Sequence, residues 1–368
     1  MLPKDLLNVF AKNNMGPFIG VPCSILAPLI DEIINEKNLI YINACNEGEA
    51  LSIASGMNLC DTLPVVLLQN SGLGNLVNPI TSLLHPYKIG CFLCISVRGF
   101  RGKDDQPQHN FMGGITERLL DLLGIKYAFL ESNNYNEVIK DLVTYAIENK
   151  KPVALLITKG ILEKLSVADK NIETKCNYLK QTDVLDLILE KFKDSIMVST
   201  TGKISRELFY LNKNKHNSKK IFYMYGSMGC VNSIALGISQ IKKNERIVVV
   251  DADGALLMKL GNLSTIGSMK PNKFTHIVID NESYLSTGGQ PSNSQTTHLE
   301  KVALNCGYDQ VYRTSNYEEL VKILDDVKSS NSLTMVLVKT SISIPEVARA
   351  DKSIDSIVAD FKDCLNKI

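Results

Sequence analysis

Two apolar segments that each end in a polar cluster constrain the fold of this chain more than any other feature. The first covers residues 248–253 and the second residues 277–283, and a helical stretch over residues 256–269 separates them. Strands joined through a helix run parallel and end at the same edge of a sheet. The sequence therefore predicts a βαβ unit in which Asp253 and Asn281 converge.

The residues at this predicted edge suit a hard metal ion that is bound together with a phosphate ligand. One carboxylate (Asp253) and one amide oxygen (Asn281) cannot enclose Mg²⁺ alone, but they fit a magnesium ion that also binds phosphate oxygens and water. The pair therefore predicts a diphosphate ligand. The alternative is an ordinary βαβ turn with acidic surface residues. Asp280 either adds a second carboxylate near the ion or caps the next turn.

Short β-rich segments alternate with helical stretches along the chain, and this alternation predicts an α/β protein with parallel sheets. The length of 368 residues suggests about two domains. We expect these domains at residues 1–162 and 180–368, joined by a charged linker over residues 163–179. Strands are predicted over residues 39–42, 65–69, 90–97, 152–158, 196–199, 247–251, 276–280 and 333–339, and helices include residues 26–36 and 317–328.

Charge and composition argue against several classes of partner. The net charge of +1 gives no support for nucleic acid or a membrane surface, and no apolar run approaches the roughly 20 residues that span a bilayer. Nine scattered cysteines and a start unlike a secretory signal predict reduced thiols in a cytoplasmic protein. Cys91 and Cys94 have CxxC spacing, but they lie within a predicted strand, which favours core packing over zinc.

An acidic residue lies on the apolar face of the helix that follows the first predicted strand. Asn43 or Asn46 can cap this helix. Glu47 shares a face with small and apolar residues at 3–4 spacing, whereas Glu49 points elsewhere. On periodicity alone, both acids simply favour the positive N-terminus of the helix.

Segments across nearly the whole chain resemble those of the thiamine diphosphate-dependent phosphonopyruvate and sulfopyruvate decarboxylases. Asp253-Gly254 followed by Asn281 is similar to the diphosphate motif of this family, and Asn46-Glu47 is similar to its pyrimidine motif. The resemblance implies two three-layer domains, a pyrimidine domain and a diphosphate domain, without a middle domain. Further segments that carry it are residues 20–24, 69–75, 78–79, 98–99, 106–109, 201–208, 225–229 and 286–291.

Three positions depart from the family pattern. Ala252 stands in place of a glycine, Asp280 in place of an asparagine, and Cys23 where family members often have aspartate. Alanine at position 252 costs little if its φ is negative and is penalised if its φ is positive.

The resemblance implies that thiamine diphosphate and Mg²⁺ are the cofactors. In the family, the residue matching Glu47 hydrogen-bonds the aminopyrimidine ring, which promotes formation of the reactive carbon nucleophile. The residue matching Met228 props the bent cofactor, and the carbonyl of the one matching Gly226 binds its exocyclic amine. The metal ligands implied are Asp253, Asn281 and the carbonyl of Ser283, and the other cofactor-binding residues are Ser227, Gly254 and Ala255.

The substrate implied is 3-phosphonopyruvate, which loses CO₂ to give phosphonoacetaldehyde in the biosynthesis of 2-aminoethylphosphonate. His109 is the candidate proton donor, since histidine titrates near neutral pH. Arginine suits oxyanion binding, although Asp104 and Asp105 nearly balance the charge of the loop after residue 97. The candidate substrate-binding residues are Ser24, Asn70, Arg98, Arg101 and Lys103. In the family the cofactor bridges two subunits, so the resemblance implies at least a homodimer.

Three alternatives stay open. A sulfopyruvate decarboxylase would share the fold and the cofactor, and a carboligase would join the reacting carbon to a second carbonyl. A nucleotide-binding regulatory module would use Gly72-Leu73-Gly74, which follows a predicted strand, but a short glycine pair is weak evidence. This last alternative leaves Glu47 and the pair of Asp253 and Asn281 unexplained.

Overall fold

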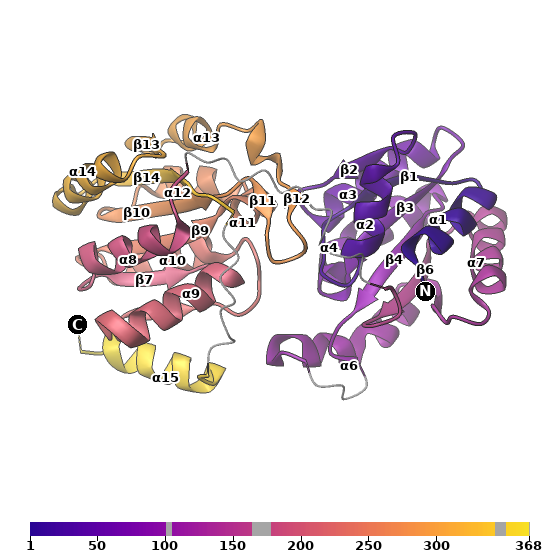
Figure 1. Cartoon of the computed structure of the whole chain (residues 1–368), viewed down its shortest axis with the longest axis horizontal. Coiled ribbons are helices and arrows are strands. Elements are labelled where there is room, and N and C mark those ends of the chain that lie inside the picture. The colour runs from indigo at the N-terminus through magenta and orange to yellow at the C-terminus, as the bar shows by residue number, and fades with distance from the viewer. Residues whose placement is uncertain (101–104, 164–177, 343–350, 368) are drawn as a thin grey trace. The chain divides into compact units, whose positions relative to one another are not determined.

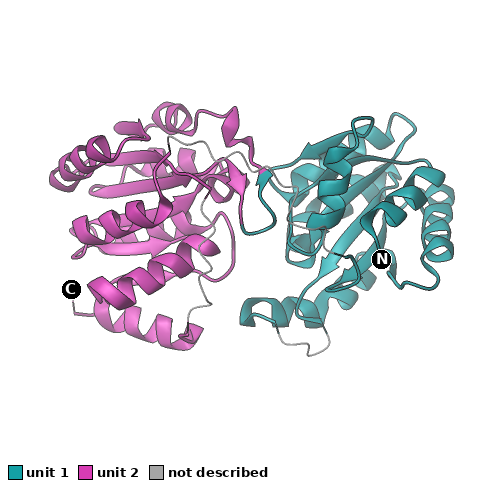
Figure 2. Ribbon diagram, viewed as in Figure 1, with its two compact units in different colours: residues 1–170, 286–290 teal, residues 171–285, 291–368 magenta. Residues whose placement is uncertain are grey.

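The computed structural model describes residues 1–100, 105–163, 178–342 and 351–367. The chain divides into two compact units (Figure 2): unit 1 comprises Met1–Lys170 and Ser286–Gln290, and unit 2 comprises Asn171–Leu285 and Pro291–Ile368. The division falls within the predicted linker over residues 163–179, most of which lies outside the described residues, so the domain boundaries stay a prediction. Nothing in the sequence pattern indicated that residues 286–290 would group with unit 1.

Unit 1 is built on a six-stranded sheet in which every neighbouring pair is parallel. Its strand order is β2-β1-β3-β4-β6-β5. Successive residues of β3 and β4 alternate between two buried apolar clusters, as side chains on opposite faces of a strand must. The strands are β1 (Met15–Gly20), β2 (Tyr41–Asn43), β3 (Leu63–Gln69), β4 (Phe92–Val97), β5 (Lys126–Phe129) and β6 (Val153–Thr158).

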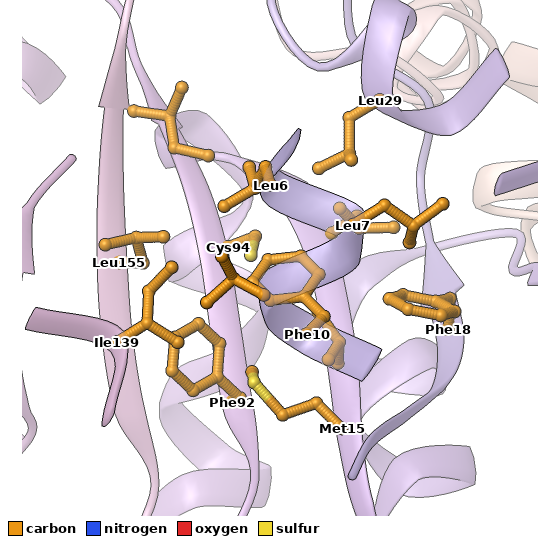
Figure 3. Close-up of a cluster of buried hydrophobic side chains, with 14 of the residues drawn as sticks. Leu6, Leu7, Phe10, Met15, Phe18, Leu29, Phe92, Cys94, Ile139 and Leu155 are labelled. Carbon is orange, nitrogen blue, oxygen red and sulfur yellow. The ribbon is translucent and has the colours of Figure 1, made fainter. Parts of the chain in front are cut away.

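Helices cover both faces of this sheet (Figure 1). On one face, Phe10 packs against Phe18 and Phe92, with ring centroids 6.1 and 6.0 Å apart (Figure 3). Tilted and edge-on aromatic pairs at these distances add to the stabilisation from burial. The helices are α1 (Pro3–Lys12), α2 (Ala27–Asn35), α3 (Glu47–Asn58), α4 (Leu73–Pro79), α5 (His85–Tyr87), α6 (Pro107–Leu122) and α7 (Tyr135–Asn149).

Unit 2 repeats this architecture with a second six-stranded parallel sheet, in the order β13-β14-β10-β9-β7-β8. Its strands are β7 (Ile196–Ser199), β8 (Ile221–Tyr223), β9 (Ile247–Ala252), β10 (Phe274–Asp280), β13 (Gln310–Thr314) and β14 (Leu333–Lys339), with the short strands β11 (Ser283–Tyr284) and β12 (Gln290–Pro291), the first residue of β12 being grouped with unit 1. Its helices are α8 (Gln181–Lys191), α9 (Lys203–Leu211), α10 (Val231–Ile241), α11 (Asp253–Met258), α12 (Asn262–Met269), α13 (Leu299–Asn305), α14 (Tyr317–Ser329) and α15 (Ile354–Leu365).

The two sheets share one topology. Numbered within its own unit, each sheet has the strand order 2-1-3-4-6-5 when read from the appropriate edge. Parallel sheets of this kind bind ligands at the carboxyl ends of their strands. The predicted α/β class with two parallel-sheet, three-layer units is confirmed.

One helix and six strands differ from the sequence-based expectation. The helical stretch over residues 256–269 is two helices, α11 and α12, because the chain leaves helical conformation at Lys259 and a glycine, a poor helix former, precedes α12. Strand β1 was missed because Gly16, Pro17 and Gly20 are depleted in strands. A side chain at Gly20 would place its Cβ 2.6 Å from the carbonyl oxygen of Leu67 on β3. The other missed strands, β5, β8, β11, β12 and β13, are short or polar.

Within the described part of the chain, no helix is long and apolar enough to cross a membrane.

Candidate active site

The N-terminus of α3 separates the roles of its two acids. The side chain of Asn46 accepts the N–H of Glu49 at 3.0 Å, and the Glu49 carboxylate accepts the N–H of Cys45 at 2.7 Å. This arrangement is close to a capping box, except that Glu49 binds the N–H of the residue before the cap, and the Asn46 side chain satisfies one of the unpaired N–H groups at the helix start. Asn46 is thus the cap, and Glu49 completes it. Glu47 takes no part in either bond, so capping does not explain why an acid stands at this position.

The Glu47 carboxyl is buried, with 6% of the residue exposed. The amide of Asn75, on α4, donates to its Oε2 at 2.7 Å. Gly72 lies directly against the carboxyl, and a Cβ atom at that position would overlap it. A buried carboxylate is costly unless it is hydrogen-bonded or has a functional partner. The segment after β3 therefore holds Glu47 in one position.

Gly72→Ala is expected to lower turnover by roughly 10- to 100-fold, because a small displacement of a reacting group has effects of this size. The backbone of Gly72 has φ −77°, which alanine adopts without strain, so the effect arises from the overlap with Glu47. Gly74→Ala is the matched control, since a Cβ there meets no atom within 4 Å. Steady-state kinetics and thermal melts of both variants check this. Equal turnover in the two variants would contradict the prediction.

Asn70 joins the ends of β3, β4 and the helix α6. Its amide donates to the carbonyl of Arg98 and to the hydroxyl of Thr116, each at 3.0 Å, and its oxygen accepts the Arg98 N–H at 3.2 Å. The side chain is 1% exposed. The predicted substrate contact of Asn70 is untested, and the structure gives this residue a second role, which is to position Arg98. Ser24 is exposed, whereas Arg101 and Lys103 lie outside the described residues.

The guanidinium of Arg98 is held by a carboxylate of the same loop. Its Nε and Nη2 donate to the two carboxylate oxygens of Asp105 at 3.0 and 2.6 Å. The N–H groups of Gly99 and Gln106 also donate to Asp105. Burial opposes ionisation of Asp105, but the hydrogen bonds and the charge of Arg98 outweigh it and hold the pKa of this carboxyl well below its usual range. Asp105 is therefore the partner of Arg98, whereas Arg101, Lys103 and Asp104 lie outside the described residues, so the role of this loop stays a prediction.

Asp105→Asn is expected to lower the free energy of unfolding at pH 7 by about 1–2 kcal/mol, as for other charge-assisted bonds near a surface. Because the folded-state pKa of Asp105 is depressed, its contribution is complete above the unfolded-state pKa near 4 and fades as the pH falls below that value. The difference between native protein and variant should shrink from pH 7 to pH 3 in urea unfolding. Asp121→Asn, at an exposed position on α6, should show no such trend. A difference that is constant with pH would argue against the pair.

The candidate proton donor, His109, lies in the first turn of α6. The backbone that follows β4 lies in close contact with this helix. A Cβ at Gly99 would overlap the carbonyl of His109, and a Cβ at Gly113 would overlap the carbonyl of Gly99. Gly99 also has φ +67°, a conformation that favours glycine. The two glycines therefore let the loop that carries Arg98 lie against the helix that carries His109.

In unit 2, β9 and β10 are parallel neighbours, with Ala252 beside Ile279. Asp253 and Asp280 follow directly in this register, and the hydroxyl oxygen of Ser294 lies within hydrogen-bond distance of both carboxylates, at 3.1 and 2.8 Å. Ser292 also donates to Asp253. Burial and the charge of Asp280 raise the pKa of Asp253 to about 7. The predicted βαβ unit is therefore present, and its two strands end at one cluster of oxygen atoms.

The donor set at this edge fits a divalent cation that is completed by a ligand. Asp253 is 3% exposed and forms no ion pair among the described residues. The oxygen of Asn281 accepts the N–H of Ser283 at 3.0 Å and retains a second lone pair. In the described part of the chain, no group of three or more His, Cys, Asp or Glu side chains can hold a metal ion. A cation held by these residues would take the rest of its shell from phosphate or water, and the metal site itself stays a prediction.

Two questions about departures from the motif have structural answers. Ala252 has φ −127°, an extended conformation open to any residue, so the loss of glycine costs nothing there. Asp280 forms an ion pair with Lys339, whose Nζ lies 2.5 Å from the Asp280 carboxylate. Its other oxygen accepts the N–H of Glu282 at 3.0 Å, which is the capping role.

The remaining cofactor candidates lie in two glycine-containing turns of unit 2. Gly226, Ser227 and Met228 precede α10, and Ser227 has φ +58°. Gly254 and Ala255 begin α11 and are buried. A Cβ at Gly254 would overlap the ring of Tyr284, so this turn packs as tightly as a glycine permits.

The structure also adds residues to the candidate site that sequence reasoning missed. The added residues are Gly72 and Asn75 beside Glu47, Ser292 and Ser294 beside Asp253, and Lys339 beside Asp280. Only the position of Gly72 after a strand offered a signal in the sequence. Glu47, Arg98 and His109 belong to unit 1, and the cluster around Asp253 belongs to unit 2.

Comparison with known proteins identifies the family of this chain. The model of the thiamine pyrophosphate enzyme C-terminal TPP binding domain matches residues 200–338, which include every candidate on the diphosphate side. The chain is 34% identical to a phosphonopyruvate decarboxylase of Streptomyces viridochromogenes, over 86% of this chain and 83% of that protein. It is 24% identical to a sulfopyruvate decarboxylase of Methanosarcina acetivorans, over 90% and 89%. It is 35% identical to the sulfopyruvate decarboxylase subunit beta of Methanocaldococcus jannaschii, over 49% of this chain and 98% of that subunit.

Identity at this level over most of both chains decides between the enzyme and the regulatory module. The chain belongs to the family of thiamine diphosphate-dependent phosphonopyruvate and sulfopyruvate decarboxylases, and it is a 2-oxoacid decarboxylase.

Proposed function

We propose that this enzyme decarboxylates 3-phosphonopyruvate to phosphonoacetaldehyde and CO₂, with thiamine diphosphate and Mg²⁺ as cofactors. One observation supports this choice of substrate: among single-chain relatives, identity is 34% to a phosphonopyruvate decarboxylase and 24% to a sulfopyruvate decarboxylase. The separate alpha and beta subunits of another sulfopyruvate decarboxylase are 36% and 35% identical over 41% and 49% of this chain, so the substrate is decided by the assay below and not by identity alone. The product would feed the biosynthesis of 2-aminoethylphosphonate.

Mg²⁺, and through it the diphosphate of the cofactor, would be held by Asp253, Asn281 and the carbonyl of Ser283. The rest of the cofactor-binding surface would be formed by Gly226, Ser227, Met228, Gly254 and Ala255. Thiamine diphosphate, when bound, supplies a carbon nucleophile and accepts the electron pair that CO₂ leaves behind. Glu47 would hold a proton at the pyrimidine ring nitrogen, and the hydrogen bond from Asn75 supports its placement for that task.

On the substrate, Arg98 would bind an oxyanion, and His109 would deliver a proton to the carbon from which CO₂ has left. Ser24, Asn70, Arg101 and Lys103 are the further candidates. Asp105 accepts from Nε and from one N–H of Nη2, and a guanidinium has five N–H groups, so a bidentate bond from Nη1 and Nη2 to the phosphonate does not require Asp105 to move. A phosphonate carries about one more negative charge than a sulfonate near pH 7, by analogy with phosphate. The phosphonate would therefore bind the Arg98 guanidinium more strongly than a sulfonate would.

A parallel assay of phosphonopyruvate, sulfopyruvate and pyruvate, with thiamine diphosphate and Mg²⁺, tests this proposal. We expect the highest kcat/KM with phosphonopyruvate. A higher value with sulfopyruvate would assign the enzyme to that acid. Carbon–carbon bond formation with an added aldehyde, at a rate above that of simple decarboxylation, would identify a carboligase.

We further propose that the functional form is at least a homodimer, in which each site combines unit 1 of one subunit with unit 2 of another. The assignment of Glu47 and Asp253 to different units is compatible with this form. Sedimentation equilibrium of the purified protein measures the assembly, and a monomer that turns over at full rate would exclude it.

A further inference from the structure

The turn that follows β10 has an unusual backbone for its sequence. Glu282 has φ +59°, in the left-handed region where glycine is the ordinary residue and other side chains cost free energy. This turn contains Asn281 and Ser283, two of the proposed cation ligands. A glutamate in such a conformation points to a role for its side chain.

Two groups donate hydrogen bonds to the Glu282 carboxylate. The Nζ of Lys339 donates to its Oε1 at 2.9 Å, and the hydroxyl of Tyr178 donates to the same oxygen at 3.2 Å. Lys339 is the last residue of β14, pairs in register with Asp280, and is 4% exposed. The same Nζ lies 2.5 Å from Asp280. One ammonium group therefore bridges the residues immediately before and after Asn281.

Lys339 is itself kept charged by this arrangement. Burial would lower the pKa of its ammonium group, but the hydrogen bonds and charges of Asp280 and Glu282 outweigh that effect and raise it. Asp280 in turn shares Ser294 with Asp253. The network thus reaches from β14 through the turn to the carboxylate that starts α11.

We propose that Lys339 and Glu282 are positioning residues that hold the Asp280–Ser283 turn in the geometry that a divalent cation requires. The inference rests on the proposed function of Asp253, Asn281 and Ser283 as cation ligands. Lys339 and Glu282 do not touch the cation themselves. Their ion pair fixes the backbone on both sides of Asn281, so that the side-chain oxygen of Asn281 and the carbonyl of Ser283 are already ordered before the cation binds.

Glu282→Gly is the decisive variant, because glycine relieves the positive φ while it removes the carboxylate. We expect the variant to fold with a melting midpoint close to that of the native protein. Its Mg²⁺ affinity, measured by calorimetry at saturating thiamine diphosphate, should fall roughly 10-fold or more, as for other residues that orient metal ligands. Lys339→Met should show the same loss of affinity together with lower stability, since it leaves two buried carboxylates without their cation.

Lys270→Met, which breaks an exposed pair with Asp309 at 3.4 Å, is the control for loss of a lysine and should bind Mg²⁺ as the native protein does. Native Mg²⁺ affinity in Glu282→Gly would overturn the inference and leave the network a purely stabilising one. Failure of the native protein itself to bind Mg²⁺ with thiamine diphosphate would instead refute the proposed cofactor site, so the two failures are distinguishable.

Discussion

Glu47→Gln is expected to reduce kcat by at least roughly 100-fold and to leave the affinity for thiamine diphosphate within about threefold of the native value. Positioned acids and bases contribute 10²–10⁴-fold to rate in enzymes generally. Glutamine fills the same space and keeps an oxygen that can accept the Asn75 amide, so the buried site stays intact. It cannot hold or transfer a proton at the ring nitrogen. Calorimetry of cofactor binding and steady-state decarboxylation separate these two quantities.

Glu49→Gln is the matched control for this substitution. It lies on the same helix turn and is an acid of the same size, but it is more exposed and bonds the N–H of Cys45. We expect a small loss of helix stability and no change in kcat, because capping interactions act on folding rather than on chemistry. If both variants retained native turnover, the role of Glu47 would have to be abandoned.

The contrast between these two glutamates shows what local pattern can and cannot predict. Periodicity correctly placed Glu47 on the packed face of α3 and Glu49 away from it, because both positions follow from the 3.6-residue repeat. It did not distinguish a structural acid from a functional one. That distinction needed Asn75, which lies 28 residues away, and Gly72, whose missing side chain makes room for the carboxyl.

The strands show the same limit. Long apolar runs such as β10 and β14 were located within two residues at each end, since a buried parallel strand is apolar on both faces. Strand β1 was missed because its glycines and proline serve close backbone approach rather than strand propensity. The convergence of β9 and β10 followed from the handedness and direction of a βαβ connection.

Charge compensation at the diphosphate edge was beyond the reach of sequence reasoning. Asp280 and Lys339 are 59 residues apart, and each looks like the polar end of an ordinary strand. Their pairing depends on β14 lying next to β10, a neighbour relation that strand patterns alone do not specify. The sequence left Asp280 as either a second cation ligand or a cap, and only the three-dimensional arrangement separates these roles.

The largest effect on cofactor binding is expected from Asp253→Asn. Asparagine has the shape of aspartate and can still accept the hydroxyls of Ser292 and Ser294, but it brings no charge to the cation. We expect the Mg²⁺-dependent affinity for thiamine diphosphate to fall roughly 100-fold or more, beyond the 10- to 100-fold typical of residues that only orient ligands. Calorimetry with and without Mg²⁺ measures this change.

The ligand-free protein provides the test for misfolding in this variant. Asp253 is buried beside Asp280, and this environment raises its pKa to about 7, so the ionised form is disfavoured in the metal-free site. Removing its charge should therefore leave the melting midpoint at pH 8 unchanged or higher, while the rise in midpoint on addition of Mg²⁺ and thiamine diphosphate is lost. Asp326→Asn, at an exposed position on α14, should keep that rise in full. An Asp253→Asn protein that melts like the native one and still gains the full rise would show that the cation binds elsewhere.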